Sequence, residues 1–386
     1  MGIRVAVGLS ESFDAVEAFS EAADEARATL DAPCDLCLVF AGAPHLGHGK
    51  WILSTVHEAL EPGALIGCGA GGVVGPGREV EEGPAAVVWA ASMPDAAIST
   101  HHFEVEQVEG GFEVHGLPDR ESLGDAMIVL ADPYSFATEA LLDRLATIAP
   151  GVPVLGGLAS AAAAGSASLF RDGDVVAGGA VACSLSGISV LPCVSQGAVP
   201  VGPEMTITAA SGNVIAELAS KPAIERLREA IAVLDPREQR LAATGLMLGI
   251  VIDENRPEYG RGDFLVRPIL GADSEAGTIA VGERVRLGQT VRMHVRDGVS
   301  ADEDLREALR GEREALGGSP PAGVLLFTCN GRGSHMFEVP NHDATAIEDA
   351  LGVPAGGFFC AGEIGPVGGR NFLHGFTATM AVFPAE

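Results

Sequence analysis

One layout, a strand followed by a helix, a glycine-rich segment and a closing strand, occurs three times along the chain and limits its possible folds. Roughly thirty residues lie between the opening strand and the glycine-rich segment in each copy, and a fixed spacing is typical of an internal repeat. We therefore predict repeated β-α-β-β units. The opening strands, helices, glycine-rich segments and closing strands are expected at 35–41, 51–60, 64–72 and 85–91, then 126–131, 136–148, 152–160 and 179–185, then 323–328, 344–351, 356–365 and 377–383.

The predicted strands are apolar on both faces, which is typical of sheets that are covered on both sides. Layers stacked as helix, sheet, sheet and helix fit this pattern, and so does an open sheet with helices on both faces. We predict a mixed α/β (α+β) fold with mixed sheets covered by helices. Two domains are expected, with two copies in residues 1–216 and the third copy plus inserted strands in residues 217–386.

The charge of the chain excludes several classes of partner. It carries 52 acidic and 24 basic residues, a formal net charge of −28, so phosphate backbones and anionic membrane surfaces repel it. No stretch reaches the about 18 consecutive apolar residues that a membrane span needs, and the N-terminus lacks a signal-peptide pattern. We expect a cytoplasmic protein that binds neither nucleic acid nor membrane.

Two motifs that resemble cofactor or metal sites fail on their context. Gly67–Gly72 matches the dinucleotide fingerprint, but Val73–Gly77 cannot open the helix that would hold the pyrophosphate. Cys34 and Cys37, with two histidines downstream, have spacings too short for a zinc site, and buried apolar roles are favoured for both thiols. We predict no cofactor and no metal.

The third copy holds the densest group of polar residues. Arg332 lies in a glycine-rich segment after the opening strand, and its planar fork suits a carboxylate or phosphate. Glu363 follows the next strand with the opposite charge. If both loops leave the same edge of a sheet, they could hold a zwitterion, whereas the alternative is an Arg–Glu ion pair that closes a loop. The candidate ligand-binding residues are Asn330, Arg332, Gly333, His335, Gly362 and Glu363.

Two cysteines are alternative catalytic candidates. Cys329 ends a strand and Cys360 precedes a glycine-rich turn, with His335 and His342 as candidate bases. A thiol needs a base within hydrogen-bond reach to become a nucleophile. Structural roles are favoured, since free cysteine is among the most buried residue types.

The chain resembles the FIST family of paired N-terminal and C-terminal sensory domains over nearly its whole length. The resemblance rests on TCNGRG (328–333), PAGGFF (354–359), GEIGP (362–366), LHGFT (373–377), IGCGAGGV (66–73), LGGLAS (155–160) and NVIAEL (213–218). It implies sensing of a small ligand, with an amino acid or a derivative as the usual suggestion.

Family members often carry a fused output module, whereas this chain ends at Glu386 directly after its last predicted strand. A protein partner for signal output is therefore expected. The leading hypothesis is a small-ligand-binding sensory protein. A cysteine-dependent enzyme acting on a small metabolite and a non-catalytic scaffold or oligomer component are the alternatives.

Overall fold

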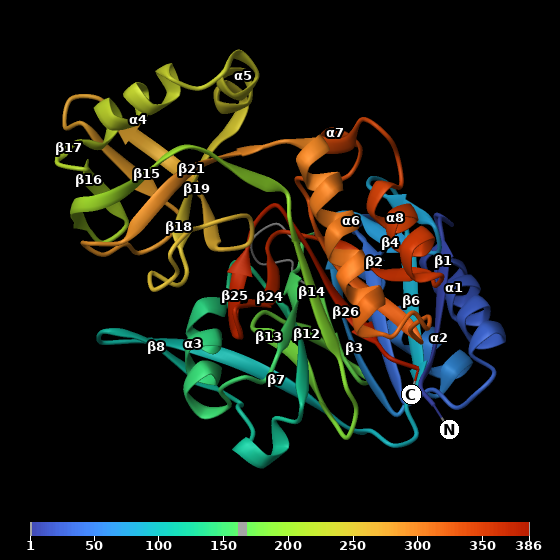
Figure 1. Cartoon of the computed structure of the whole chain (residues 1–386). Coiled ribbons are helices and arrows are strands. Elements are labelled where there is room, and N and C mark those ends of the chain that lie inside the picture. Colours follow the sequence, from blue (N-terminus) through green and yellow to red (C-terminus); the bar gives the residue numbers. More distant parts are fainter. Residues whose placement is uncertain (1, 161–167, 386) are drawn as a thin grey trace. The chain divides into compact units, whose positions relative to one another are not determined.

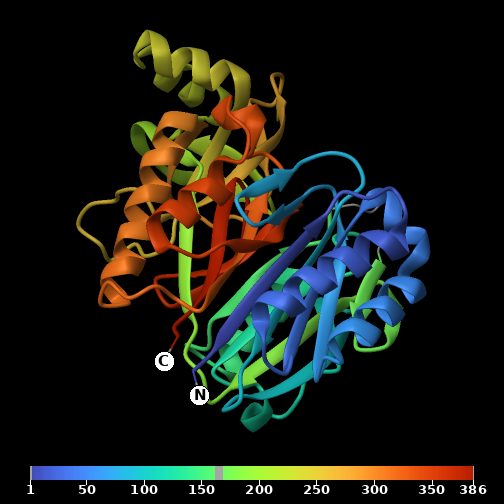
Figure 2. The same cartoon turned by 90° about the vertical axis from the view of Figure 1, so that its right-hand side faces the viewer.

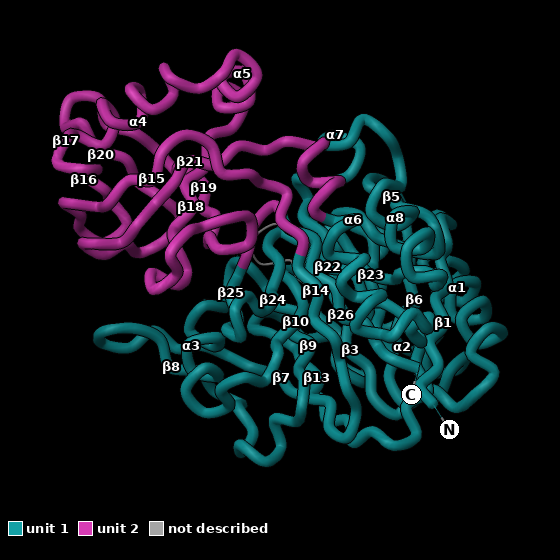
Figure 3. Tube along the Cα trace, viewed as in Figure 1, with its two compact units in different colours: residues 1–194, 305–373, 377–386 teal, residues 195–304, 374–376 magenta. Residues whose placement is uncertain are grey.

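A computed structural model describes residues 2–160 and 168–385. The chain forms two compact units, which Figure 3 colours separately. The first, here called the repeat unit, contains residues 1–194, 305–373 and 377–386. The second unit contains residues 195–304 and 374–376. The predicted boundary at residue 216 lies inside the second unit and does not coincide with this division.

The repeat unit contains three mixed sheets of the same plan (Figure 1). In each sheet the closing strand pairs antiparallel with the opening strand, and the opening strand pairs parallel with the glycine-rich strand that follows the crossover helix. The predicted β-α-β-β units are therefore confirmed. In the order closing, opening, glycine-rich, these strands are β6 (Ala86–Ser92), β2 (Leu36–Gly42) and β3 (Ala64–Ala70); β13 (Ala180–Ser186), β9 (Ala126–Ala131) and β10 (Val154–Leu158); and β26 (Thr377–Phe383), β22 (Gly323–Cys329) and β23 (Ala355–Cys360).

Helices cover the outer face of each sheet, while the inner faces of all three meet in one apolar core that includes Trp89, Leu130 and Phe358. Figure 2 shows two helices from the N-terminal part of the chain, in blue, lying across the sheet of the first copy. Neither stacking arrangement left open by the sequence describes this, because three sheets rather than two share the core. The covering helices are α1 (Ala15–Leu30) and α2 (Gly49–Leu60), then α3 (Thr138–Ile148), then α6 (Gly298–Ala315) and α8 (His342–Leu351).

The hairpin that follows each glycine-rich strand joins the sheet of a different copy. The hairpin of the first copy pairs with β23 of the third, that of the second pairs with β3 of the first, and that of the third pairs with β10 of the second. This cyclic exchange makes one compact unit of three copies that are far apart in sequence. The hairpin strands are β4 (Val73–Gly75) and β5 (Arg78–Val80), β11 (Ser168–Arg171) and β12 (Asp174–Ala177), and β24 (Glu363–Val367) and β25 (Arg370–His374).

One glycine in each glycine-rich strand explains why this segment recurs. Gly67, Gly156 and Gly357 each face the backbone of their register partner in the opening strand. A Cβ at any of the three would overlap that partner's carbonyl oxygen. Only glycine therefore fits. The glycine-rich segments predicted from the sequence are strands over most of their length.

The remaining elements of the repeat unit extend the sheets or connect them. The edge strand β1 lies beside β6, the long hairpin β7–β8 lies beside β13, and β14 lies beside β26. These and the short helices are β1 (Arg4–Ser10), β7 (Ala97–Val108), β8 (Gly111–His115), β14 (Leu191–Gln196), η1 (Ala43–His48), η2 (Arg120–Ser122) and α7 (Ser334–Phe337).

The second unit is an antiparallel sheet that closes on itself, because its first strand also pairs with β16 (Val214–Leu218) near its far edge. The elements are β15 (Ala198–Ser211), β17 (Lys221–Pro222), α4 (Ala223–Ala232), α5 (Pro236–Gly245), β18 (Leu246–Val251), β19 (Phe264–Asp273), β20 (Thr278–Val281) and β21 (Thr290–Arg296). Among the described residues of the whole chain, no helix is long and apolar enough to cross a membrane.

Candidate functional site

The ends of the three glycine-rich strands meet inside the repeat unit. The backbone N–H of Ser160 donates to the carbonyl of Gly69 at 3.3 Å, which links the second copy to the first. The N–H of Ala361 donates to Leu158 at 3.0 Å, which links the third copy to the second. The N–H of Phe359 donates to Gly72 at 2.9 Å, which closes the ring between the third copy and the first.

Ser160 is the side chain that ties these ends together. Its hydroxyl accepts a hydrogen bond from the N–H of Gly71 at 2.7 Å and donates one to the carbonyl of Phe359. Gly71, Asn330 and Ala361 are exposed, and Ser160 is half-buried. A Cβ on Gly71 would lie 3.5 Å from the Ser160 hydroxyl and 3.9 Å from Oδ1 of Asn330. These four residues form a solvent-facing surface built from all three copies, here called the central rim.

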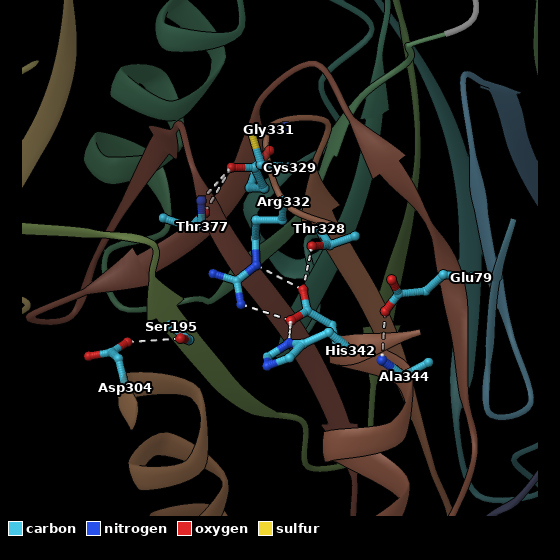
Figure 4. Close-up of polar contacts among 12 residues, drawn as sticks. Glu79, Ser195, Asp304, Thr328, Cys329, Gly331, Arg332, His342, Ala344 and Thr377 are labelled. Atoms are coloured by element: carbon cyan, nitrogen blue, oxygen red, sulfur yellow. Dashed lines mark hydrogen bonds and ion pairs between the residues drawn. The ribbon is translucent and has the colours of Figure 1, made fainter. Parts of the chain in front are cut away.

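Arg332 does not present its fork to solvent. The side chain is fully buried and forms a double hydrogen bond with Asp343, from Nε to Oδ2 and from Nη2 to Oδ1, each at 2.8 Å. Figure 4 shows the Arg332 guanidinium near His342, and the guanidinium carbon lies 5.0 Å from the centre of the Phe337 ring. Arg332 thus closes a loop through an ion pair. Its partner is Asp343, not Glu363 as the sequence alternative supposed.

Asp343 is held as a carboxylate. Burial opposes its ionisation, but the Arg332 guanidinium outweighs that effect and lowers the pKa of Asp343 well below its ordinary value. The hydroxyl of Thr328 donates to it at 2.8 Å, and Nδ1 of His342 lies 2.9 Å away. Asn341 is the N-cap residue of α8, and the Asp343 side chain in the first turn of this helix forms the ion pair.

Glu363 is also fully buried, in the first position of β24. Its Oε2 accepts hydrogen bonds from the N–H and the hydroxyl of Thr377, at 3.1 Å and 2.9 Å. Burial raises the pKa of Glu363 to about 8, although Thr377, the thiol of Cys329 and the charge of Arg332 partly oppose that rise. The side chain is therefore mostly protonated at pH 7. The predicted zwitterion grip would need an ionised Glu363 and a free Arg332 fork, and this geometry provides neither.

The hairpin of the first copy also forms hydrogen bonds with the segment after Arg332 and with the start of α8. Glu81 accepts hydrogen bonds from the N–H and the hydroxyl of Ser334, at 2.8 Å and 3.0 Å, and occupies the space that a Cβ on Gly333 would need. Glu79 accepts from the N–H of Ala344 at 2.9 Å, and burial together with the Asp343 charge raises its pKa to about 7. No local sequence signal predicts these contacts, since they join residues more than 250 positions apart.

The two cysteine candidates are both buried. Burial raises the pKa of Cys360 well above its ordinary value, so its thiolate is disfavoured. Cys329 is nearly buried and its sulfur accepts the N–H of Gly331 at 3.4 Å. Of the two predicted bases, His335 is exposed on α7, while the His342 ring stacks on Phe337 with centres 3.5 Å apart.

The motif that resembles a metal site also consists largely of buried side chains. Cys34 and Cys37 are buried, in agreement with the apolar role favoured from the sequence. His45 is buried against Phe19. No group of three or more potential metal ligands occurs within residues 2–160 and 168–385.

Two cavities in the repeat unit are lined by other residues. The larger, about 340 Å³, lies beside Pro153, Pro192, Pro366 and Asn371. The smaller, about 240 Å³, lies where α6 and α8 end, beside Arg313 and Asp349. Neither is lined by a residue of the central rim.

The fold and site together define a mixed α/β protein whose repeats bring three loop regions to one exposed rim. The chain belongs to the FIST family: the FIST N domain matches residues 35–221, and the FIST C domain matches residues 223–366. FIST domains are sensory and signal-transduction domains. The predicted family is thereby confirmed.

The chain has full-length relatives in mycobacteria. It is 44% identical to the Mycobacterium tuberculosis protein Rv0628c over 384 residues, which cover 99% of this chain and 100% of the relative. It is 42% identical to the Mycobacterium bovis protein Mb0898c over 385 residues, which cover 99% of each chain. A crystal structure of cyanuric acid hydrolase from A. caulinodans aligns over 99% of both chains with 12% identity, but its TM-score of 0.27 is too low to establish a shared fold.

Proposed function

We propose that this chain is a sensory protein that binds a small polar ligand on the central rim. The observation that carries the proposal is the meeting of Gly71, Ser160, Asn330 and Ala361 from three repeat copies on one exposed surface. Glycine at position 71 leaves the backbone open to close approach by a ligand. The carboxamide of Asn330 supplies both a donor and an acceptor at the same place.

In this proposal Arg332 and Glu363 stabilise the loops of the rim and do not contact the ligand themselves. Arg332 orders the loop that carries Asn330 by pairing with Asp343 on α8. Glu363 anchors the start of β24, directly after Gly362, through Thr377. Gly333 leaves the space that the Glu81 side chain occupies, and the exposed His335 is an additional candidate contact.

An amino acid is the ligand class that the family resemblance suggests, and we propose it as the first class to test. The carboxamide of Asn330 can donate to a carboxylate and accept from an ammonium group without a buried charge. A protein partner would carry the output signal.

The test is a thermal shift of the full chain against a panel of the common amino acids at millimolar concentration. A ligand present at a hundred times its Kd adds about 2.7 kcal/mol to the free energy of unfolding. The Gly71→Ala variant places a methyl group between Ser160 and Asn330 at ordinary contact distance, so the fold tolerates it while the rim is filled. Asn330→Ala removes the carboxamide.

The matched control is Gly47→Ala, because a Cβ there would contact nothing within 4 Å. We expect the amino acid that shifts the wild type to shift Gly47→Ala equally and to lose its shift in both rim variants. A shift that survives in Gly71→Ala and Asn330→Ala would contradict the rim as the binding site. A panel without any shift in the wild type would contradict the amino-acid class and leave the scaffold alternative in its place.

A further inference from the structure

The hairpin of β7 and β8 forms one edge of the sheet of the second copy. Among the residues that the structure describes, β8 is the last strand in the order of this seven-stranded sheet. Figure 3 shows the end of the hairpin extending away from the rest of the repeat unit. An edge strand presents a row of backbone N–H and C=O groups to any strand that approaches it. The outer edge of β8 can therefore accept a further strand.

One face of this hairpin is apolar. Val105 lies opposite Val114, and Gln107 lies opposite Phe112, so these four side chains share one face. The two valines are half-buried and pack against the apolar cluster that includes residues of α3. Phe112 lies further out on the same face and is 51% exposed. The apolar surface of the sheet thus continues to the edge strand without being covered there.

The opposite face is acidic. Glu104 lies opposite His115, and Glu106 lies directly opposite Glu113, and all four side chains are exposed. Nε2 of His115 lies 3.5 Å from Oε2 of Glu106. No lysine or arginine occurs between residues 97 and 115 of the sequence. Like charges directly opposite each other destabilise a strand pair, so a cation beside Glu106 and Glu113 would relieve an unfavourable contact.

We propose that the outer edge of β8 binds an extended segment of a protein partner in which basic and apolar residues alternate. The side chains of an added strand point alternately to the two faces of the sheet. Its basic residues would lie on the face of Glu113, and its apolar residues on the face of Phe112. In this mode of recognition the main-chain hydrogen bonds provide affinity and the alternate side chains provide specificity. The proposal does not depend on the ligand of the central rim.

A second copy of this chain fits the edge less well. Pairing of β8 with the β8 of another copy would bring Glu113 of one copy close to Glu113 of the other, and like charges across a strand pair repel. The formal net charge of −28 adds a general repulsion between copies. Charged side chains on an edge strand are a common protection against self-association. A basic segment meets the opposite condition, because the same glutamates attract it.

Phe112 supplies a backbone N–H at the free edge. Val108 and Gly111 close a two-residue turn, so they form a hydrogen-bonded pair, and such pairs alternate with open pairs along an antiparallel ladder. Phe112, the next residue, therefore directs its N–H and C=O away from β7. Proline is accepted at an edge position whose N–H faces outward. Phe112→Pro removes this donor, whereas Phe112→Ala removes the same ring and keeps the donor.

The test measures binding of fluorescently labelled hexapeptides to the full chain by anisotropy, at about 50 mM salt so that exposed charges are only partly screened. One peptide alternates lysine and valine, and a second has the same composition with its lysines and valines in two blocks. We expect the alternating peptide to bind about tenfold more tightly than the block peptide, since it alone matches both faces. Phe112→Pro should bind it more weakly than Phe112→Ala.

The matched control is a change of charge elsewhere on the repeat unit. The variant with Glu106→Lys and Glu113→Lys should lose the preference for the alternating peptide. The variant with Glu307→Lys and Glu314→Lys, both exposed on α6, changes the net charge equally and should keep that preference. Circular dichroism checks that each variant keeps its fold.

Three results would overturn the proposal. Equal binding of the two peptides to the wild type would show attraction by net charge alone. Equal binding of the alternating peptide to Phe112→Pro and Phe112→Ala would exclude strand addition at β8. A dimer of the wild type in sedimentation that Phe112→Pro dissociates would assign the edge to a second copy of the chain instead.

Discussion

Replacing Glu363 by glutamine should change how the stability of the protein depends on pH. Burial raises the pKa of Glu363 from 4.5 to about 8, so the folded protein keeps a proton on this carboxyl that the unfolded chain releases. Between these two pH values the native state binds one more proton than the unfolded state. The free energy of unfolding then falls as pH rises, by about 1.4 kcal/mol per pH unit for this one group.

The size of the effect follows from the interval between the pKa of Glu363 in the unfolded chain, 4.5, and its pKa in the folded protein, about 8. Over the full interval the loss is on the order of 5 kcal/mol, which is an upper bound because the native state relaxes. Below pH 4.5 the carboxyl is neutral in both states, and above pH 8 it is ionised in both, so the stability contribution is constant at either end. Glu363→Gln removes the titrating group, while its amide oxygen still accepts from Thr377.

The assay is urea unfolding of the wild type and Glu363→Gln at a series of values from about pH 5 to about pH 9. We expect the variant to gain stability relative to the wild type as pH rises, with the difference levelling off above about pH 8. Taking the difference cancels the titration of Glu79 and of other groups shared by both proteins. Glu109→Gln, in the exposed turn between β7 and β8, is the control for the change of residue itself. A stability difference that stays constant across the series would refute the reasoning.

Three further changes test the packing of the site by urea unfolding. Asp343→Ala leaves the buried Arg332 charge without its partner and should cost about 3–5 kcal/mol; a loss below about 1 kcal/mol would show that Arg332 finds another partner at no cost. Gly157→Ala places a Cβ on the sulfur of Cys360 and should cost about 1–3 kcal/mol. A variant as stable as the wild type would show that this strand does not pack against the Cys360 sulfur. Ser160→Ala removes the hydroxyl that joins the three copies and should cost about 1–2 kcal/mol, and an unchanged midpoint would argue against that role.

The sequence predicted the repeat because the repeat is local. Each copy carries its own apolar strands and its own helix, and Gly67, Gly156 and Gly357 recur because each lies against the neighbouring strand's backbone. The exchange of hairpins could not be predicted in the same way. Pairing between β4 and β23 joins segments almost three hundred residues apart, and nothing in either strand specifies its partner.

The candidate site was predicted in part. The sequence identified the loop around Asn330 and Arg332, since a glycine-flanked cation after a strand is unusual. It did not identify the partner of Arg332, because Asp343 reads equally well as a helix cap. It also did not select Ser160, whose role depends on the approach of two other copies and on no signal of its own.

A crystal structure with the most stabilising amino acid of the panel would test the central claim most directly. We expect ligand density on the central rim, with ligand atoms in hydrogen-bond distance of the Asn330 carboxamide and contacts to at least two repeat copies. Density in the cavity beside Pro153, Pro192 and Pro366, with the rim open to solvent, would contradict the claim.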